Sequence, residues 1–84
     1  MEYVYDDGEY RVYRTSWNRD CYILERFTSY RTPLKGVIEY DWLSVGDFYY
    51  NEDCDCYEEK YIYHRPRVAA KTLSEFIQKK REMG

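Results

Sequence analysis

The sequence lacks the features that mark most membrane-spanning and secreted chains. No apolar run approaches the roughly 20 residues that a membrane-spanning helix needs. No short apolar stretch of the kind found in signal peptides follows Met1. Cysteine occurs three times, an odd number that argues against a framework of paired disulfides. We therefore expect a cytoplasmic protein in which Cys21, Cys54 and Cys56 are free thiols.

Residue patterns that support catalysis are also scarce. His64 is the only histidine, and the four glycines form no phosphate-binding loop. Nothing near the cysteines supplies the positive charge that activates a thiolate. These absences predict a protein that is not an enzyme and uses no cofactor.

A zinc site is the metal site that the sequence comes closest to. Cys54 and Cys56, together with Cys21 and His64, offer a Cys3His donor set. The donor pairs are not spaced as in zinc fingers, and carboxylates flank Cys54 and Cys56. We therefore predict no metal site.

Tyrosine, by contrast, is unusually common. It accounts for 12 of the 84 residues, against three phenylalanines and two tryptophans. Each tyrosine combines a large apolar ring with a hydroxyl that needs a hydrogen-bond partner, which suits half-buried sheet positions and interfaces. Two interpretations stay open: a small sheet built from tyrosine, or tyrosines left on a contact surface.

Local patterns predict one α+β domain over residues 1–84. We expect an antiparallel sheet of four to five strands at about 2–64, with one C-terminal helix at about 73–83 packed on it. Asp7-Gly8 between two Tyr/Val runs predicts a hairpin, with Tyr3 and Tyr5 on one face of its first strand. The expected strands cover residues 1–6, 9–15, 21–30, 37–43 and 57–64. Gly46 should end the fourth strand, and residues 48–50 fit either a short strand or a helical turn.

The helix is the most clearly marked element. Thr72 and Glu75 have the spacing of a capping box, in which threonine is the N-cap and glutamate lies three residues later. Leu73, Phe76 and Ile77 form a narrow apolar stripe at helical spacing, as expected for a helix that lies across one face of a sheet.

Charge is distributed unevenly along the chain. Residues 1–38 hold six acids and six bases, whereas residues 39–59 hold eight acids and no base, and residues 60–84 hold seven bases and two acids. A base-free acidic segment attracts basic surfaces and repels nucleic acid. Residues 39–59 are called the acidic segment below. Its acids either pair with the basic C-terminal helix or remain free for a partner.

The acidic segment also carries rings that could anchor a partner. On extended structure, side chains of the same face repeat about every 6.5–7 Å, which resembles the roughly 7 Å spacing of phosphates along a nucleic-acid strand. We therefore predict that a basic protein surface binds here. The predicted contact residues are Asp47, Tyr49, Tyr50, Glu52, Asp53, Asp55, Tyr57, Glu58 and Glu59.

In size, acidity, tyrosine content and expected architecture, the chain resembles the small proteins that phages and mobile elements encode against host defence, such as anti-CRISPR and anti-restriction proteins. This resemblance extends over the whole chain but includes no motif. It implies an inhibitor that acts in the host cytoplasm as a nucleic-acid mimic, blocks a basic nucleic-acid-binding site, and in many cases dimerises.

Two other functions stay open. The Tyr10-Arg11-Val12-Tyr13-Arg14 run interleaves rings and cations as single-strand binders do, and with the basic helix it predicts a nucleic-acid-binding regulator. A small domain with open strand edges can also pair edge to edge, which predicts a self-assembling accessory subunit.

Overall fold

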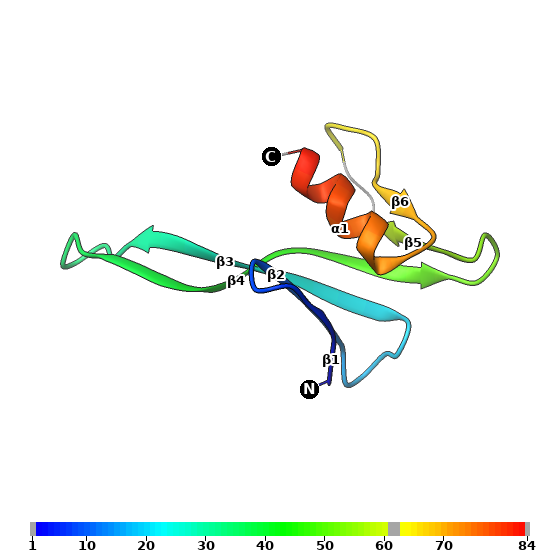
Figure 1. Ribbon diagram of the computed structural model, residues 1–84, viewed down its shortest axis with the longest axis horizontal. Coiled ribbons are helices and arrows are strands. Elements are labelled where there is room, and N and C mark those ends of the chain that lie inside the picture. The colour runs from blue at the N-terminus through cyan, green and yellow to red at the C-terminus, as the bar shows by residue number, and fades with distance from the viewer. Residues whose placement is uncertain (1, 61–62, 84) are drawn as a thin grey trace.

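Residues 2–60 and 63–83 are described by a computed structural model, which shows one antiparallel sheet and one helix (Figure 1). The sheet has six strands in chain order, each paired with the next. The strands are β1 (Glu2–Asp6), β2 (Tyr10–Arg14), β3 (Cys21–Arg31), β4 (Ile38–Asn51), β5 (Cys56–Glu59) and β6 (Ala69–Ala70), and helix α1 (Leu73–Glu82) follows. The α+β class and the C-terminal helix are confirmed. The sheet has six strands, whereas four to five were expected.

The predicted break at Gly46 is wrong. Strand β4 continues through this glycine for 14 residues and includes residues 48–50. Gly46 pairs with Leu24 and the next pair is Glu25 with Ser44, so Val45 is an extra residue on β4. Such a β-bulge lets a strand continue while its twist increases locally.

The chain after β4 also differs from the expectation. The predicted strand at 57–64 ends at Glu59, and Tyr63 and His64 lie in a bend. Residues 1, 61 and 62, which belonged to expected strands, lie outside the described residues. Strand β6 was not predicted, because its two alanines carry no alternating pattern.

Helix α1 covers one face of the sheet and forms the core with it. Phe76 stacks on Phe48 of β4, with ring centroids 4.2 Å apart. The N-cap prediction is confirmed, since the Thr72 hydroxyl accepts a hydrogen bond from the backbone N–H of Glu75 at 3.1 Å. The buried hydrophobic residues are Tyr10, Val12, Tyr22, Leu24, Phe48, Val68, Ala70, Phe76 and Ile77. The opposite face of the sheet, called the open face below, carries no helix of the described chain (Figure 1).

A bulge in β1 separates two tyrosines that were expected on one face. Tyr3 pairs with Tyr13, but Tyr5 pairs with Val12, so the register shifts between them. Tyr5 therefore packs against the core, while Tyr3 lies on the open face, where its ring makes an edge contact with Tyr13.

Strands β3 and β4 extend well beyond the rest of the sheet as a two-stranded arm, seen at the left of Figure 1. We use "arm" for residues 27–45. The molecule measures 48 × 30 × 22 Å, and its radius of gyration is 14.1 Å, against about 12 Å for a compact domain of this length. The arm therefore adds surface without adding to the core.

The first turn joins the hairpin to the end of the helix. One carboxylate oxygen of Asp7 accepts the backbone N–H groups of Glu9 (2.9 Å) and Tyr10 (2.7 Å). The other accepts the Tyr5 hydroxyl at 2.9 Å and the Arg81 guanidinium at 2.7 Å. Burial alone would raise the pKa of Asp7, but these hydrogen bonds outweigh it and lower the pKa to about 2.

Replacing Asp7 with alanine should destabilise the fold by about 1–2 kcal/mol, because four hydrogen bonds lose their acceptor while their donors regain water only in part. Urea unfolding followed by circular dichroism measures this loss. Asp20→Ala is the matched control, since Asp20 is an exposed turn aspartate at the other end of β2, and it should change stability by less than about 0.5 kcal/mol. Equal effects of the two substitutions would contradict the role given to Asp7.

Candidate interaction surface

The acidic segment does not form one continuous surface. Its residues run along β4, through the β4–β5 turn and along β5, so they alternate between the two faces of the sheet. Strand β4 alone has 14 residues, which span about 45 Å at about 3.3 Å per residue. The structure therefore separates the nine predicted contact residues into buried, paired and exposed groups.

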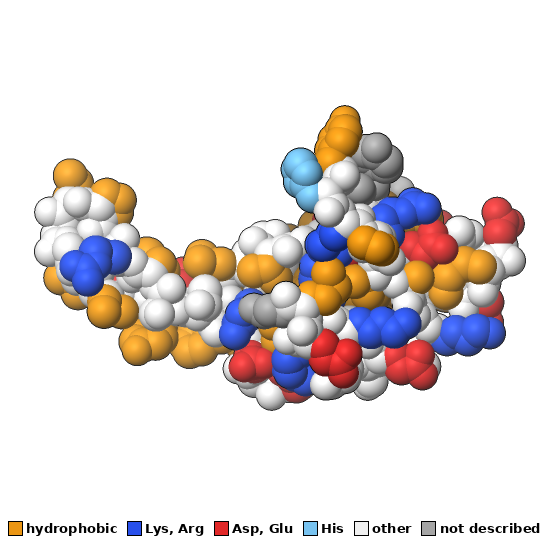
Figure 2. Space-filling view, turned by 90° about the horizontal axis from the view of Figure 1, so that it is seen from above, with side chains coloured by type: hydrophobic (Ala, Val, Ile, Leu, Met, Phe, Trp, Pro, Cys, Tyr) orange, Lys and Arg blue, Asp and Glu red, His pale blue; other side chains and the backbone are white. Residues whose placement is uncertain are grey.

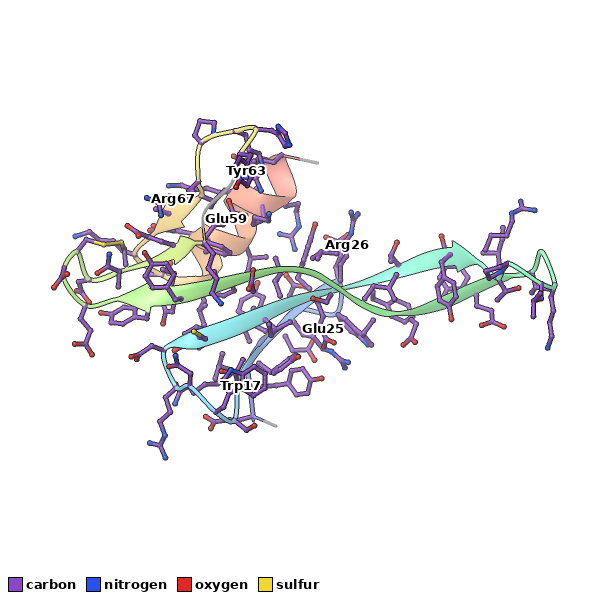
Figure 3. All side chains as sticks on the ribbon, turned by 180° about the vertical axis from the view of Figure 1, so that it is seen from behind. Trp17, Glu25, Arg26, Glu59, Tyr63 and Arg67 are labelled. Atoms are coloured by element: carbon purple, nitrogen blue, oxygen red, sulfur yellow. A yellow bond between two sulfur atoms is a disulfide. The ribbon has the colours of Figure 1, made fainter. Side chains whose placement is uncertain are left out.

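Glu59 belongs to the buried group and is not available to a partner. Its side chain lies under the chain that leads into β6, and the residue is 3% exposed. The Arg65 guanidinium donates to both carboxylate oxygens at 2.7 and 2.9 Å, and Lys80 of α1 donates at 2.8 Å. The backbone N–H of Val68 completes the set at 2.7 Å. Figure 3 shows Glu59 between the sheet and the helix.

This network determines the ionisation of Glu59. Burial by itself raises the pKa of the carboxyl group, but the hydrogen bonds from Arg65, Lys80 and Val68 outweigh it and lower the pKa from 4.5 to about 2. Glu59 is therefore a buried, fully paired carboxylate at neutral pH. Glu59 of the acidic segment therefore pairs with Lys80 of the basic helix. This agrees, for this one acid, with the interpretation that the acids pair with the helix.

Four other predicted residues are also engaged within the fold. Tyr49 donates its hydroxyl to Glu58 at 2.8 Å, which raises the pKa of Tyr49. Asp47 forms an exposed ion pair with Lys60 at 3.2 Å. Tyr57 is half-buried, and its ring packs edge-on against Phe48 of the core. These side chains hold β4 and β5 together.

Tyr50 likewise supports the core. Its ring lies 5.2 Å from that of Tyr57, centroid to centroid, and both pack against the buried cluster. Among the nine predicted residues, this leaves Glu52, Asp53 and Asp55, which are exposed in the turn between β4 and β5. Within residues 2–60 and 63–83 none of the three forms an ion pair.

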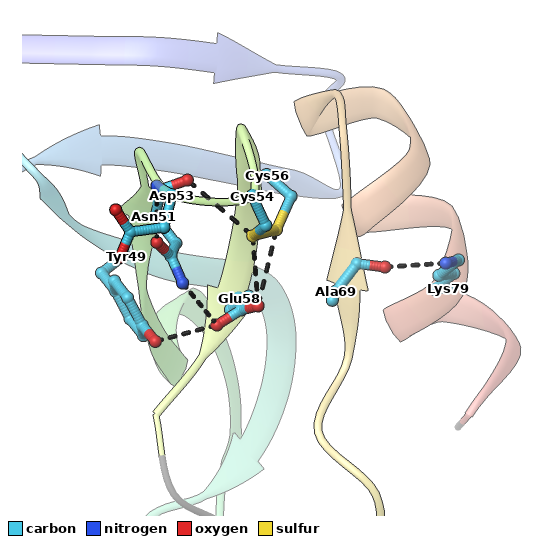
Figure 4. Close-up of a disulfide and its surroundings, with 8 residues drawn as sticks. All are labelled: Tyr49, Asn51, Asp53, Cys54, Cys56, Glu58, Ala69 and Lys79. Carbon is cyan, nitrogen blue, oxygen red and sulfur yellow. Dashed lines mark hydrogen bonds between the residues drawn. A yellow bond between two sulfur atoms is a disulfide. The ribbon is translucent and has the colours of Figure 1, made fainter.

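The same turn corrects the prediction of three free thiols. Cys54 and Cys56 form a disulfide, and Cys21 remains free (Figure 4). Asp55 between them has φ 55°, a left-handed conformation that aspartate tolerates in tight turns. The disulfide takes up two of the four donors of the Cys3His set. Cys54, Cys56 and Glu58 do bring their donor atoms within 4.8 Å of one another, and Glu58 lies within 3.5 Å of both sulfurs.

The most exposed apolar surface lies on the arm, which sequence reasoning did not single out. Leu34 at the tip is 99% exposed, Tyr40 is 68% exposed and Ile38 is 56% exposed. Eight of the twelve exposed large hydrophobic residues of the described chain belong to the arm; they are Phe27, Tyr30, Leu34, Val37, Ile38, Tyr40, Leu43 and Val45. Figure 2 shows their side chains along the projecting part of the molecule.

The arm has two different faces. On the open face, Phe27 stacks with Tyr40 at a centroid distance of 6.2 Å and packs at a tilt against Trp42 at 5.4 Å. Arg11 of β2 lies over the Trp42 ring at 4.2 Å and pairs with Glu25 at 2.7 Å. The open face of the arm is therefore an aromatic strip, and the Arg11–Glu25 ion pair lies at the end of this strip next to the rest of the sheet.

The helix-side face of the arm mixes apolar and acidic groups. Leu43 pairs with Arg26, Asp41 with Thr28 and Glu39 with Tyr30. The Tyr30 hydroxyl donates to Glu39 at 3.2 Å, and this hydrogen bond raises the pKa of Tyr30. At the base of this face a cavity of about 320 Å³ lies between the arm and the end of α1. It is lined by Tyr10, Arg26, Val45, Arg65, Lys80 and Met83.

The residues that suggested single-strand binding are mostly engaged inside the fold. Tyr10 is 4% exposed, Arg11 is paired with Glu25, and Arg14 lies over the Tyr22 ring at 5.8 Å. Stacking of bases requires exposed rings, which the buried Tyr10 does not provide, and binding of single strands stays a prediction.

Comparison with known proteins adds no family to these observations: no family model, no curated protein and no solved structure matches the chain. Within residues 2–60 and 63–83, no helix has the length and apolar character that crossing a membrane requires. The interpretation of the surface therefore depends on its own geometry.

Glu59→Gln should destabilise the protein at pH 7 by about 3 kcal/mol, because it leaves Arg65 and Lys80 without their buried counter-charge. Since the folded pKa of Glu59 lies below its ordinary value, its contribution is complete above about pH 4.5 and is lost as the pH falls towards 2. Urea unfolding at pH 7, 5, 4 and 3 measures both effects. A variant whose stability fell with acid as steeply as that of the native protein would contradict the assignment.

The disulfide gives a direct chemical prediction. Alkylation of the denatured but unreduced protein should modify Cys21 alone, and reduction before alkylation should expose Cys54 and Cys56 as well. Mass spectrometry counts the modified thiols. Three modified thiols without reduction would restore the original prediction of free cysteines.

Proposed function

We propose that this protein is a non-enzymatic, protein-binding inhibitor or regulator that contacts its partner through the arm. The observation that supports this most strongly is the concentration of exposed apolar side chains on residues 27–45. Contiguous exposed apolar surface on a soluble domain usually marks an interaction site. A two-stranded hairpin is also only marginally stable in water by itself, so covering it would stabilise the arm.

The chemistry of the helix-side face favours a basic partner. Residues 38–47 of β4 contain three carboxylates and no lysine or arginine; Glu39 and Asp41 lie on the helix-side face, and Asp47 lies on the open face. Only Asp47 of these three forms an ion pair within the described residues. Glu39 and Asp41 precede the exposed Leu43 on the same face of β4, so an apolar anchor and two negative charges lie in one row. Such an arrangement directs encounter with a positively charged surface.

A nucleic-acid-binding protein is the class of partner that fits this charge pattern. Glu39 and Asp41 lie on the same face of one strand, about 7 Å apart, which is close to the phosphate spacing of a nucleic-acid strand. Inhibition of a host defence enzyme in the cytoplasm is the biological role that we propose. The exposed turn acids Glu52, Asp53 and Asp55 lie at the other end of β4 and could form a second contact with a large partner.

Two sets of charge reversals distinguish the arm from the turn. After a partner is captured from a bacterial lysate and purified, its affinity is measured by titration calorimetry. The arm set is Glu39→Lys with Asp41→Lys, and the turn set is Glu52→Lys with Asp53→Lys. We expect the arm set to weaken binding at least about tenfold and to reduce its salt dependence, and the turn set to weaken it less.

Trp17→Ser is the control, because Trp17 is 80% exposed but lies in the β2–β3 turn, away from the arm. Glu59 is left unchanged in every variant, since its reversal would test folding and not binding. Unchanged affinity of the arm set would contradict the proposal. Binding of single- or double-stranded DNA or RNA by the native protein at micromolar concentration in a gel shift would contradict the choice of partner.

A further inference from the structure

The open face of the arm differs from its helix-side face because the charged side chains that β3 and β4 place on it, Arg31 and Glu25, lie at its two ends. The register places Phe27 beside Trp42 and Ser29 beside Tyr40 in the middle of the face. Arg31 and Ile38 follow towards the tip, and Glu25 and Ser44 lie at the base; Glu25 belongs to β3 just before the arm begins. A strip of aromatic and hydroxyl side chains thus lies between Arg31 towards the tip and the Arg11–Glu25 ion pair at the inner end, where the Arg11 guanidinium lies 4.2 Å from the Trp42 ring centroid.

We propose that the open face of the arm packs against the same face of a second copy of this chain. The twofold axis would run midway between the two faces, parallel to the sheets and across the strands, at the level of Thr28. It would place β3 of one copy over β3 of the other, and β4 over β4, with the paired strands running in opposite directions. This surface is distinct from the helix-side face to which we assign the partner, so the inference does not depend on that assignment.

This arrangement matches large side chains with smaller ones. Along β3, Phe27 of each copy would face Ser29 of the other. Along β4, Ile38 of each copy would face Ser44 of the other, while Trp42 would face Tyr40 as an aromatic pair. Alternation of large and small side chains is what lets the inner faces of two sheets interdigitate at a separation of about 10 Å.

The same symmetry also matches the charges. With Thr28 at the centre, Arg31 of each copy would lie over Glu25 of the other. Arg11 and Tyr3 both donate to Oε1 of Glu25, and Oε2 is the oxygen on which a further donor could bind. Arg31 is exposed, and within the described residues its guanidinium donates to the Gly36 carbonyl at 3.5 Å. Arg31 of each copy would then share the Glu25 carboxylate with Arg11, which is paired with it at 2.7 Å.

Pairing of two β4 edges is the less favourable way to form a dimer. The part of the β4 edge that is not paired with β5 carries Glu39, Asp41 and Asp47. A twofold axis between two such edges would bring these acids of the two copies together. Like charges that face each other across strands are destabilising, and charged edge strands commonly prevent such pairing. Face-to-face packing avoids this repulsion.

The size of the strip sets the expected strength. Seven residue positions along each of the two strands, 25–31 and 38–44, cover about 23 Å by 10 Å, which is well below the roughly 800 Å² per partner of a standard stable interface. We therefore expect a reversible dimer with a Kd in the micromolar range, where many small interfaces lie.

Sedimentation velocity of the full chain between about 2 and about 200 µM tests the proposal across the expected Kd range. The native protein should shift from the monomer mass of 10.4 kDa towards twice that value. Arg31→Glu, which places like charges at both ends, and Ile38→Ser with Tyr40→Ser, which removes apolar surface, should each raise Kd at least about tenfold. Trp17→Ser, an exposed aromatic outside the strip, should leave Kd within about twofold.

A native protein that stays monomeric at about 200 µM would overturn the inference while leaving the partner proposal to its own test. A dimer that both strip variants retain, or that Trp17→Ser weakens as strongly, would show that it forms elsewhere. A dimer lost with the Ile38 and Tyr40 substitutions but unchanged by Arg31→Glu would overturn the antiparallel arrangement. Circular dichroism of each variant confirms that the fold is retained.

Discussion

The buried carboxylate of Glu59 is the interaction on which the rest of the structure depends. Glu59 is the last residue of β5. Four groups donate hydrogen bonds to its carboxylate: two nitrogens of Arg65 in the loop, the backbone N–H of Val68 and the ammonium group of Lys80 in the helix. Neither the loop nor the helix shares a strand with Glu59. A charge removed from water requires nearly complete hydrogen bonding, so this side chain ties the loop and the helix that follow β5 to the sheet.

The hairpin and the helix could be predicted from the sequence because local chemistry determines both. Gly8 has φ 89°, as the Asp-Gly pair indicated, and Thr72 caps α1 through its own side chain. Strand β6 could not be predicted, because Ala69 and Ala70 are extended only through their pairing with β5. Gly46 misled the prediction for a related reason: a glycine that ends a strand and one beside a bulge look the same in a sequence.

The candidate site was predicted less well than the fold. The acidic segment was visible as composition, but composition does not show that Glu59 points into the core while Glu52 points into solvent. The arm could have been found from one signal. Residues 21–31 and 38–45 carry apolar side chains on both faces, and the predicted helix at about 73–83 is too short to cover them along their whole length. Local patterns place residues on faces, whereas burial depends on what packs above each face, and tertiary contacts decide that.

The order of the strands has a consequence for how the chain folds. Every strand pairs with its neighbour in the sequence, so the sheet can form by successive hairpins, each of which closes only a short loop. Topologies rich in such local contacts fold quickly, since little chain entropy is lost before each contact forms. The contacts of α1 are the exception: Lys80 pairs with Glu59, which is 21 residues away, Phe76 stacks on Phe48, and Arg81 pairs with Asp7. We therefore expect the sheet to assemble early and the docking of the helix to be the last step. Only then would the Glu59 carboxylate have all of its hydrogen-bond donors.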